Sequence, residues 1–482
     1  MNFRRFTFFA LVICVFSACS EKKPRSANKV DHLNIIFVLA DDLDLDEVNF
    51  YDRKTTPSYT NDQLNGRTNY YHYKTDNFKM PTLDKMAAEG IIFDRFYSTS
   101  PVCTPARYPT LTGQYPHSYT YNKDSITSQI KIAFGISIHP DDDNIAKRFN
   151  TLGYTTAYIG KWHNGFNNSH MAMLDNNPPL EHSNYKELKN NYRFAVDYIQ
   201  DSIGFDVADR LMSENRNMHN IDWMDEGIGN FIDSNAASPF FMYVSLPIPH
   251  GNYGDTKEIN TLYTSNGELS EKPNIENDLA DAQRRNWFSN SPEMGSWLDG
   301  SMANLLGKLK EHNLYENTLI VFTSDHQSRG KMTVYESARV PTFFWMPSML
   351  EPKRIEDLAS FIDLVPTFLS LAGDSSLGDF PGMDLKPLLL ENQALNRDAV
   401  FIECSYFRGV ASKKWKYIEH TTDTFDENFM YDNEDVFPHF RDSVQLYDLE
   451  TDFAEQINLA GKTEFAEVQK EMAAKLKGFL EQ

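Results

Sequence analysis

Four separate apolar stretches of strand length are each followed by residues that can bind a metal ion or transfer a proton. The stretches are residues 34–40, 154–159, 240–246 and 318–323, followed by 41–42, 160–163, 247–250 and 324–326. Continuous apolar runs of this length are typical of strands covered on both faces. Helical spacing recurs between them, at 81–89, 145–152 and 297–312. This alternation predicts a doubly wound α/β fold, with a mainly parallel sheet flanked by helices and ligands bound at the carboxyl ends of its strands.

A chain of 482 residues is long enough for more than one domain. We expect the α/β domain to cover residues 34–375. A smaller C-terminal α+β subdomain is expected over residues 376–482, because 399–404 and 414–418 have the composition of strands and a helix with one apolar face closes the chain.

The N-terminus resembles an export signal. Two arginines precede an apolar run at residues 6–16, which is too short to span a bilayer as a helix. Small residues then lead to Cys19, as in a bacterial lipoprotein signal. We therefore expect residues 1–19 to be a lipoprotein signal peptide with Cys19 lipidated, and residues 20–33 to be a polar tether. The alternative is an ordinary cleaved signal. Either would export the protein, and the first would place it on the bacterial cell envelope, in the periplasm or on the outer membrane or cell surface.

Charge and cysteine content exclude some classes of function. Acidic residues outnumber basic residues by 68 to 46, giving a formal net charge of −22. Nucleic acid is therefore not an expected partner, because phosphate binding needs a basic surface. Two of the four cysteines, Cys14 and Cys19, belong to the signal. Only Cys103 and Cys404 remain, and we expect no disulfide between them.

Cys103 precedes a proline, Pro105, that suits the first turn of a helix, and Arg107 lies one turn further on. Free backbone N–H groups and the helix dipole make such a position a natural seat for an anion. Taken alone, the segment could equally be a buried loop cysteine beside a structural arginine.

The Cys-Thr-Pro-Ala-Arg segment at 103–107 resembles the signature of the type I, formylglycine-dependent sulfatases of the alkaline-phosphatase-like superfamily. Similar matches follow in the order of that family at 40–42, 160–163, 249–250, 324–326 and 330–331, with weaker ones at 363–367, 446–449 and 458–459. Two residues depart from the family pattern. Ala106 replaces the common serine, and Pro109 is expected to remove one helical hydrogen bond and kink the segment.

The resemblance implies that Cys103 is oxidised to formylglycine by a formylglycine-generating or anaerobic sulfatase-maturating enzyme. One hydroxyl of the hydrated aldehyde would attack sulfur, and the other would later expel the sulfate. Asp41, Asp42 and Asp325 would hold one divalent cation per chain, Ca²⁺, together with the residue made from Cys103. His326 stands where the family often has asparagine, so it could be a metal ligand or lie just behind the ligands.

The resemblance also implies roles for the remaining site residues. Arg107 would hold the hydrated formylglycine and the carboxylates beside the metal, and Lys161 and Lys331 would bind sulfate oxygens. His163 would be the base that breaks down the sulfated intermediate. His250, alone or with Lys331, would protonate the leaving alcohol.

The implied function is hydrolysis of sulfate esters on a sulfated polysaccharide or its fragments, of algal or host origin. Trp162, Tyr115, Tyr119 and the aromatic segment at 50–73 are candidate platforms for sugar rings, although packing in the core or in loops accounts for them equally well. One alternative keeps the superfamily but hydrolyses phosphate monoesters or diesters, which members typically do with Ser or Thr and two zinc ions. Another is a non-catalytic glycan-binding lipoprotein. Both are disfavoured, the first by Cys103 in its signature and the second by competent residues at every proposed catalytic position.

Overall fold

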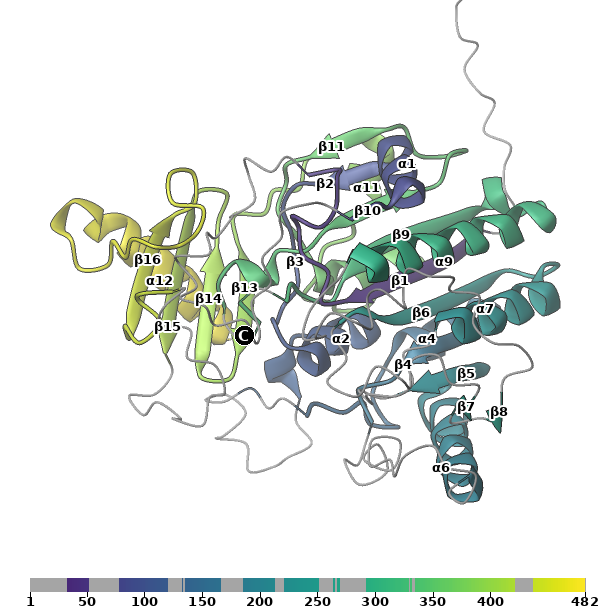
Figure 1. Ribbon diagram of the computed structural model, residues 1–482. Helices are drawn as coiled ribbons and strands as arrows, with labels where there is room; N and C mark the ends of the chain where they lie inside the picture. The colour runs from purple at the N-terminus through teal and green to yellow at the C-terminus, as the bar shows by residue number, and fades with distance from the viewer. Residues whose placement is uncertain are drawn as a thin grey trace, which may run out of the picture. The chain divides into compact units, whose positions relative to one another are not determined.

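The computed structural model describes residues 33–51, 78–119, 132, 135–165, 185–212, 221–250, 263–264, 267–268, 292–328, 330–331, 334–420 and 437–481 (Figure 1). The predicted signal peptide, Cys19 and the tether up to residue 32 lie outside these residues. The chain divides into two units, Met1–Asp31 and His32–Gln482, and the second contains every described residue. The expected boundary between residues 375 and 376 stays a prediction.

The central sheet has eight strands in the order β11-β2-β10-β9-β1-β6-β4-β5. Its strands are β1 (Asn34–Asp41), β2 (Ile91–Phe93), β4 (Thr155–Lys161), β5 (Val207–Met212), β6 (Phe240–Pro249), β9 (Thr318–Ser324), β10 (Thr342–Trp345) and β11 (Lys353–Ile355). From β9 to β5 all neighbours are parallel, whereas β10 runs antiparallel to both β9 and β2. The predicted doubly wound, mainly parallel α/β sheet is confirmed.

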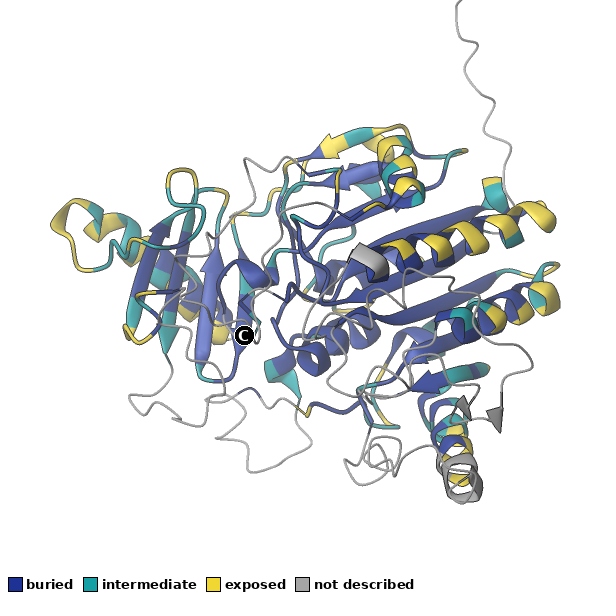
Figure 2. Ribbon diagram, viewed as in Figure 1, coloured by how far each residue is buried: buried dark blue, intermediate teal, exposed yellow. Residues whose placement is uncertain are grey.

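Helices cover both faces of this sheet (Figures 1 and 2). Alternate residues of β1 point to opposite sides, so Ile36 and Val38 join one buried cluster and Ile35 and Phe37 join another. The first face packs against α1 (Pro81–Glu89), α7 (Ile221–Asn235) and α9 (Pro292–Glu311). The second packs against α2 (Cys103–Thr112), α4 (Ile145–Thr151), α6 (Tyr185–Asp197), α10 (Leu364–Leu371) and α11 (Lys386–Glu391). A strand covered on both faces needs no polar residue, which explains the continuous apolar runs.

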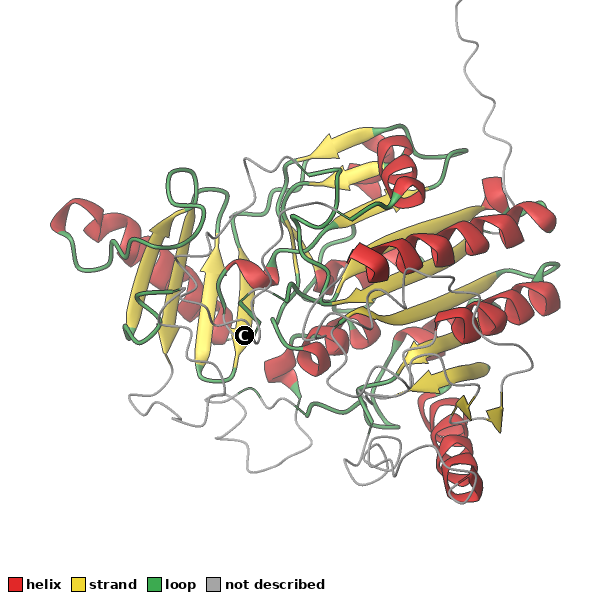
Figure 3. Cartoon of the chain, viewed as in Figure 1, coloured by secondary structure: helices red, strands yellow, loops and turns green. Residues whose placement is uncertain are grey.

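The C-terminal part forms a small antiparallel sheet with a helix against it (Figure 3). Its strands are β13 (Val400–Cys404), β14 (Phe407–Ala411), β15 (Trp415–His420) and β16 (Val444–Asp448), and its helix is α12 (Ala466–Leu480). Met472, Leu476 and Phe479 give α12 the predicted apolar face and are buried in one cluster with residues of the sheet. The expected smaller α+β unit is therefore present.

Short elements complete the described chain. They are the paired strands β3 (Phe96–Tyr97) with β12 (Ala359–Ser360) and β7 (Tyr263–Thr264) with β8 (Gly267–Glu268), the 3-10 turns Pro116–Ser118, Tyr315–Asn317, Glu336–Ala338, Phe361–Asp363 and Thr463–Phe465, and a π-helical segment Tyr198–Ile203. Among the described helices, none is both long and apolar enough to cross a bilayer. Cys103 and Cys404 are buried free thiols, in agreement with the expected lack of a disulfide.

Candidate active site

The parallel strands β1, β4, β6 and β9 bring their carboxyl ends to one edge of the sheet (Figure 1). Asp41 ends β1 and Lys161 ends β4, while His250 directly follows β6 and Asp325 directly follows β9. Register places these ends side by side, because Asp41 pairs with Pro249 and Ala40 with Ser324. The strand order therefore gathers four polar groups that are far apart in the sequence.

Helix α2 delivers Cys103 to the same edge. Cys103 is the first helical residue and only 2 % exposed. Pro105 sits in the first turn, where a missing N–H costs no intrahelical bond, and Gly113 ends the helix with a left-handed φ of 70°. Pro109 lies inside the helix as expected, where it lacks the N–H that would bond to the carbonyl four residues back. The kink itself stays a prediction.

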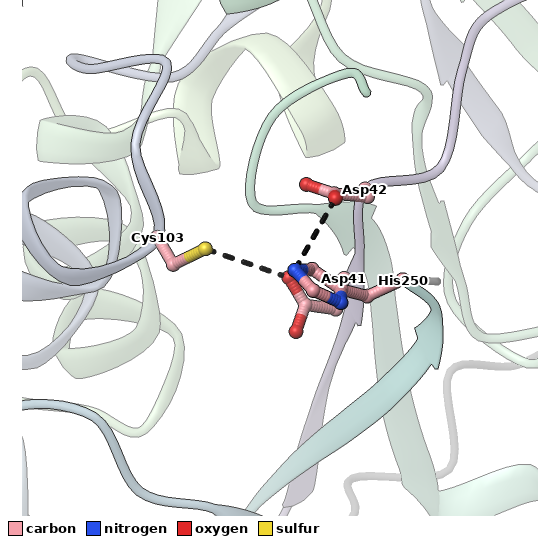
Figure 4. Close-up of side chains that lie close together, drawn as sticks. All are labelled: Asp41, Asp42, Cys103 and His250. Carbon is pink, nitrogen blue, oxygen red and sulfur yellow. Dashed lines mark hydrogen bonds and ion pairs between the residues drawn. The ribbon is translucent and has the colours of Figure 1, made fainter. Parts of the chain in front are cut away.

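The sulfur of Cys103 lies among carboxylates and imidazoles. Cys103 Sγ is 3.8 Å from Asp41 Oδ1 and 3.4 Å from His326 Nε2. Asp41, Asp42, Cys103 and His250 form one buried group whose possible ligand atoms lie within 4.8 Å of one another (Figure 4). Asp41, Cys103, Asp325 and His326 form a second, overlapping group by the same criterion. The four predicted metal-binding side chains besides Cys103 are thus gathered around it.

Three cations balance these carboxylates. Lys161 Nζ is 2.5 Å from Asp41 Oδ2, and Lys331 Nζ is 3.0 Å from both carboxylate oxygens of Asp42. Arg107 Nη2 donates to Asp325 Oδ2 at 2.8 Å and lies 3.6 Å from Asp41 Oδ1. These contacts join Lys161, Lys331 and Arg107 to the three predicted aspartates in one network at the carboxyl edge.

The charges set the protonation states. Burial alone would raise the pKa of Asp41, but Lys161, His250 and Arg107 outweigh it and lower that pKa well below its usual value. Burial would likewise raise the pKa of Asp42, but Lys331, His250 and His326 lower it on balance. Both aspartates are therefore carboxylates at neutral pH, which is the form that binds a cation.

The two imidazoles shift in opposite directions. Burial and the nearby Lys331 charge lower the pKa of His250, despite Asp42 at 3.6 Å. Burial also acts to lower the pKa of His326, but Asp325 and Asp42 outweigh it and raise that pKa to about 9. The donor set of carboxylate oxygens with adjacent imidazole fits a divalent cation, and the choice between hard and softer cations depends on whether the imidazoles ligate.

The Sulfatase family model matches residues 33–374 of the chain. The chain belongs to the sulfatase family. A second model, described as N-sulphoglucosamine sulphohydrolase, C-terminal, matches residues 325–482. Sulfatases typically use a metal ion and a formylglycine, and the buried group around Cys103 fits such a centre.

A curated relative and two solved structures illustrate the similarity of this sulfatase chain to known proteins. The N-acetylgalactosamine-6-sulfatase of Canis lupus familiaris is 27% identical over 383 residues, covering 70% of this chain and 65% of its own length. The chain thus spans slightly less than two thirds of that relative. A Bacteroides thetaiotaomicron structure from work on glycosaminoglycan metabolism superposes with a TM-score of 0.62 at 18% identity, over 94% of this chain and all of the other. The structure of the phosphonate monoester hydrolase of Agrobacterium radiobacter superposes with a TM-score of 0.55 at 18% identity. The superposition covers 92% of this chain and 95% of the other. At such identities the two structures support the fold alone.

Some predicted site residues of the sulfatase chain do not join the network. His163 lies two residues beyond Lys161 and is half-buried, and neither ligand group formed by the described residues includes it. Trp162 and Tyr115 are buried, Trp162 edge-on to Tyr158 and Tyr115 edge-on to Phe479, so of the two roles expected for them they pack in the core and do not bind sugar rings. Residues 52–73 of the aromatic segment lie outside the described residues. Tyr119 is half-buried and its role stays a prediction.

The structure also adds residues that the sequence did not single out. Ser245 Oγ donates to the backbone carbonyl of Lys161 at 2.7 Å and accepts from Arg107 Nη1 at 2.5 Å, so it ties the Arg107 guanidinium to the end of β4. Ser324 Oγ accepts from Leu43 N and links the ends of β9 and β1. The available signal was weak: Ser324 is the last residue of β9, whereas Ser245 lies in the middle of β6.

Proposed function

We propose that the chain hydrolyses sulfate esters on a sulfated carbohydrate, using a formylglycine made from Cys103 and a bound divalent cation. The observation that carries this proposal is the place of Cys103, at the first turn of α2 and in contact distance of Asp41 and His326. Membership of the sulfatase family supports the reaction class. The relative named as an N-acetylgalactosamine-6-sulfatase supports a carbohydrate substrate.

Asp41, Asp42 and Asp325 would hold the cation, and His326 is close enough to Cys103 to join them. The formylglycine hydrate and the cation together supply a nucleophilic hydroxyl at neutral pH. We assign Ca²⁺, because three carboxylates form a hard oxygen set. His250 shares a ligand group with Asp41 and Asp42. Because imidazole suits zinc better than calcium, the identity of the bound metal also tests whether His250 is a ligand.

The cations of the chain would bind and neutralise the sulfate group. Lys161 and Lys331 carry charges at the carboxyl edge and would each donate to a sulfate oxygen once a substrate competes with the aspartates. Arg107 is fully buried and paired with Asp325, so it would position the nucleophilic side chain rather than move to bind the substrate. His163 would act as the base in the second half of the reaction.

His250 would donate a proton to the leaving alcohol. In the free enzyme burial and Lys331 lower its pKa, so the ring is neutral at pH 7. A bound sulfate ester brings negative charge that opposes Lys331 and favours the protonated ring. Protonation and substrate binding would therefore be linked at this residue.

Phosphate or phosphonate ester hydrolysis is the second candidate. Its support is specific: each of the two overlapping ligand groups contains one imidazole, and imidazole suits zinc better than calcium. The similarity of the fold to a phosphonate monoester hydrolase agrees with either chemistry. A non-catalytic glycan-binding role has no comparable support.

One experiment separates these candidates. The protein, made together with a sulfatase-maturating enzyme, is assayed for sulfate release from defined sulfated oligosaccharides and for phosphate release from phosphate esters, and its bound metal is measured. The proposal expects sulfate release and about one calcium ion per chain. Phosphate release with two zinc ions per chain would replace it with the second candidate, and failure on every ester would favour glycan binding.

The same proposal includes export as a lipoprotein anchored through Cys19 and maturation of Cys103 by a dedicated partner enzyme. The charge of −22 supports a protein that does not bind nucleic acid. Residues 34–375 and 376–482 are proposed as the catalytic domain and its C-terminal subdomain.

A further inference from the structure

The segments that follow β1 and β9 are joined by hydrogen bonds beyond the candidate ligands. Leu43 N donates to Ser324 Oγ at 2.8 Å, and Leu45 N donates to Gln327 Oε1 at 3.1 Å. These backbone donors hold the two segments in a fixed register, and Asp44 lies between them.

The Asp44 side chain makes two short hydrogen bonds across this junction. Asp44 is 1 % exposed, and both of its oxygens accept from a single residue. Ser328 N donates to Asp44 Oδ1 at 2.6 Å, and Ser328 Oγ donates to Asp44 Oδ2 at 2.8 Å. Its own backbone N–H donates to Glu47 Oε2 at 2.9 Å, which fixes the turn that presents the carboxylate. Charge-assisted pairs of this kind are short and directional, so Asp44 determines where Ser328 lies.

Ser328 begins the turn that carries Lys331. Lys331 N donates to the Ser328 carbonyl at 3.3 Å, and Lys331 Nζ lies 3.0 Å from both oxygens of Asp42. Asp44 thus binds Ser328 at the start of this turn, and Asp42 binds the side chain of Lys331 at its end. If the hydrogen bonds between Ser328 and Asp44 were lost, the backbone of the turn would no longer be fixed. The flexible side chain of Lys331 would then lose the position from which it extends into the site.

We infer that Asp44 is a positioning residue that places Lys331 at the carboxyl edge of the sheet. It acts through Ser328 and touches neither substrate nor metal in this role. The kinetic consequence rests on the proposed sulfate-ester chemistry, whereas the placement of the lysine does not. A displacement of about 1 Å at a substrate-binding group can cost on the order of 100-fold in rate.

A double-mutant cycle tests the kinetic consequence. Asp44→Ala should lower kcat/KM for a sulfated sugar by roughly 10- to 100-fold in the otherwise unchanged enzyme, but by less than about 3-fold when Lys331 is already alanine. Equal losses in both backgrounds would show that Asp44 acts on the scaffold at large and would overturn the inference. If Asp44→Ala does not fold, Ser328→Ala, which keeps the backbone donor, replaces it in the same cycle with a smaller expected loss.

Amine labelling tests the placement without using activity. The Lys331 side chain is 15% exposed, so its acylation in the mature holoenzyme should be slow and should accelerate in Asp44→Ala. Thr323→Val is the matched control, because it removes the buried 2.7 Å hydrogen bond between Thr323 on β9 and Thr342 on β10 and leaves the Lys331 turn unchanged. Unchanged Lys331 labelling in Asp44→Ala, or equal acceleration in the control, would overturn the inference. If the protein releases no sulfate from any sugar, the proposed function fails while this measurement still decides the role of Asp44.

Discussion

The sulfur of Cys103 lies among negatively and positively charged groups, in contact with Asp41 and His326. Arg107 forms ion pairs with Asp41 and Asp325 beside it. Among the described residues Cys103 is a free thiol, and the neighbouring side chains of Asp41 and Arg107 are suited to oxygen chemistry. A side chain with two hydroxyls would meet an acceptor on one side and an imidazole on the other. The residue type at position 103 is therefore the sharpest test of the proposed function.

We predict that protein made with a maturation enzyme carries an aldehyde at position 103, seen as a mass decrease of the Cys103 peptide. Cys103→Ala should abolish turnover with the fold intact, because no neighbour can supply the nucleophile. Cys103→Ser should also fail under oxygen-dependent maturation, since one hydroxyl cannot both attack sulfur and expel sulfate. Full activity with an unmodified thiol, or repeated turnover by the serine variant, would contradict the formylglycine mechanism.

His250 gives a second prediction at this scale. His250→Ala should lose roughly 10²- to 10⁴-fold in kcat on a sugar sulfate but far less on an aryl sulfate, because a phenolate leaves without needing a proton. Steady-state kinetics on both substrates measure the difference. His439→Ala, which removes a surface imidazole paired with Asp442 at 2.8 Å, is the control and should change neither rate. Equal losses on both substrates would assign His250 to metal binding or structure instead.

At the scale of elements, the apolar runs predicted the central strands well because those strands are covered on both faces. The strand predicted at 154–159 extends to Lys161, so this site residue is the last residue of β4. The strand predicted at 240–246 extends to Pro249, and His250 follows it directly. Strand β5 lies at the edge of the sheet and carries Asp209 and Arg210, so it lacks an apolar run. Residues 91–93 form β2, whereas Phe96–Tyr97 form β3, which pairs with β12 outside the main sheet. Pairing partners of this kind are not encoded locally.

Helices α7 and α9 pack against each other and allow a prediction about pH. Asp225 on α7 accepts from Ser301 at 2.5 Å and from Asn304 at 2.7 Å, and burial raises its pKa to about 6. The folded protein therefore binds this proton more tightly than the unfolded chain. The stabilisation is fully present below the unfolded pKa near 4 and is lost as pH rises through about 6.

Asp225→Asn should remove that dependence. Relative to the parent protein, the free energy of unfolding of the variant should increase as pH rises from about 4 to about 7. The upper limit of this increase is ~3 kcal/mol, and partial exposure of Asp225 reduces it. Thermal unfolding across this range measures the trend. Asp233→Asn on the same helix is the control, since hydrogen bonds from His312 and Lys308 lower the pKa of Asp233, so its effect on stability titrates below about pH 4 and should be nearly constant from about pH 4 to 7. A constant difference between Asp225→Asn and the parent would show that the carboxyl does not titrate as described.

At the scale of the whole molecule, the candidate site is assembled from four strand ends and one helix start that span residues 41 to 331. The sequence predicted which residues meet, because parallel strands share a carboxyl edge and because the ordered motifs resemble those of one family. It could not predict how they pair. The link from Asp44 to Ser328, the Ser245 bridge between Lys161 and Arg107, and the burial of Trp162 all depend on packing between distant segments.

The N-terminal segment gives the prediction that concerns the whole protein. Cys19 lies outside the described residues, and every candidate catalytic residue lies in His32–Gln482. If Cys19 carries the lipid anchor, Cys19→Ala should move the protein from the membrane fraction to the soluble fraction, with the specific activity unchanged. The physical reason is that stable membrane attachment needs more than one acyl chain, which lipoprotein processing supplies at a single cysteine.

Cys14→Ala is the matched control for this prediction, because Cys14 lies within the apolar run of the proposed signal peptide but is not the expected lipidation site. It should leave the protein in the membrane fraction. Fractionation followed by detection of the protein, with mass spectrometry of the N-terminal peptide, separates the cases. Protein that stays membrane-bound in Cys19→Ala would rule out this anchor. Release together with loss of specific activity would show instead that the anchored segment supports the catalytic unit directly.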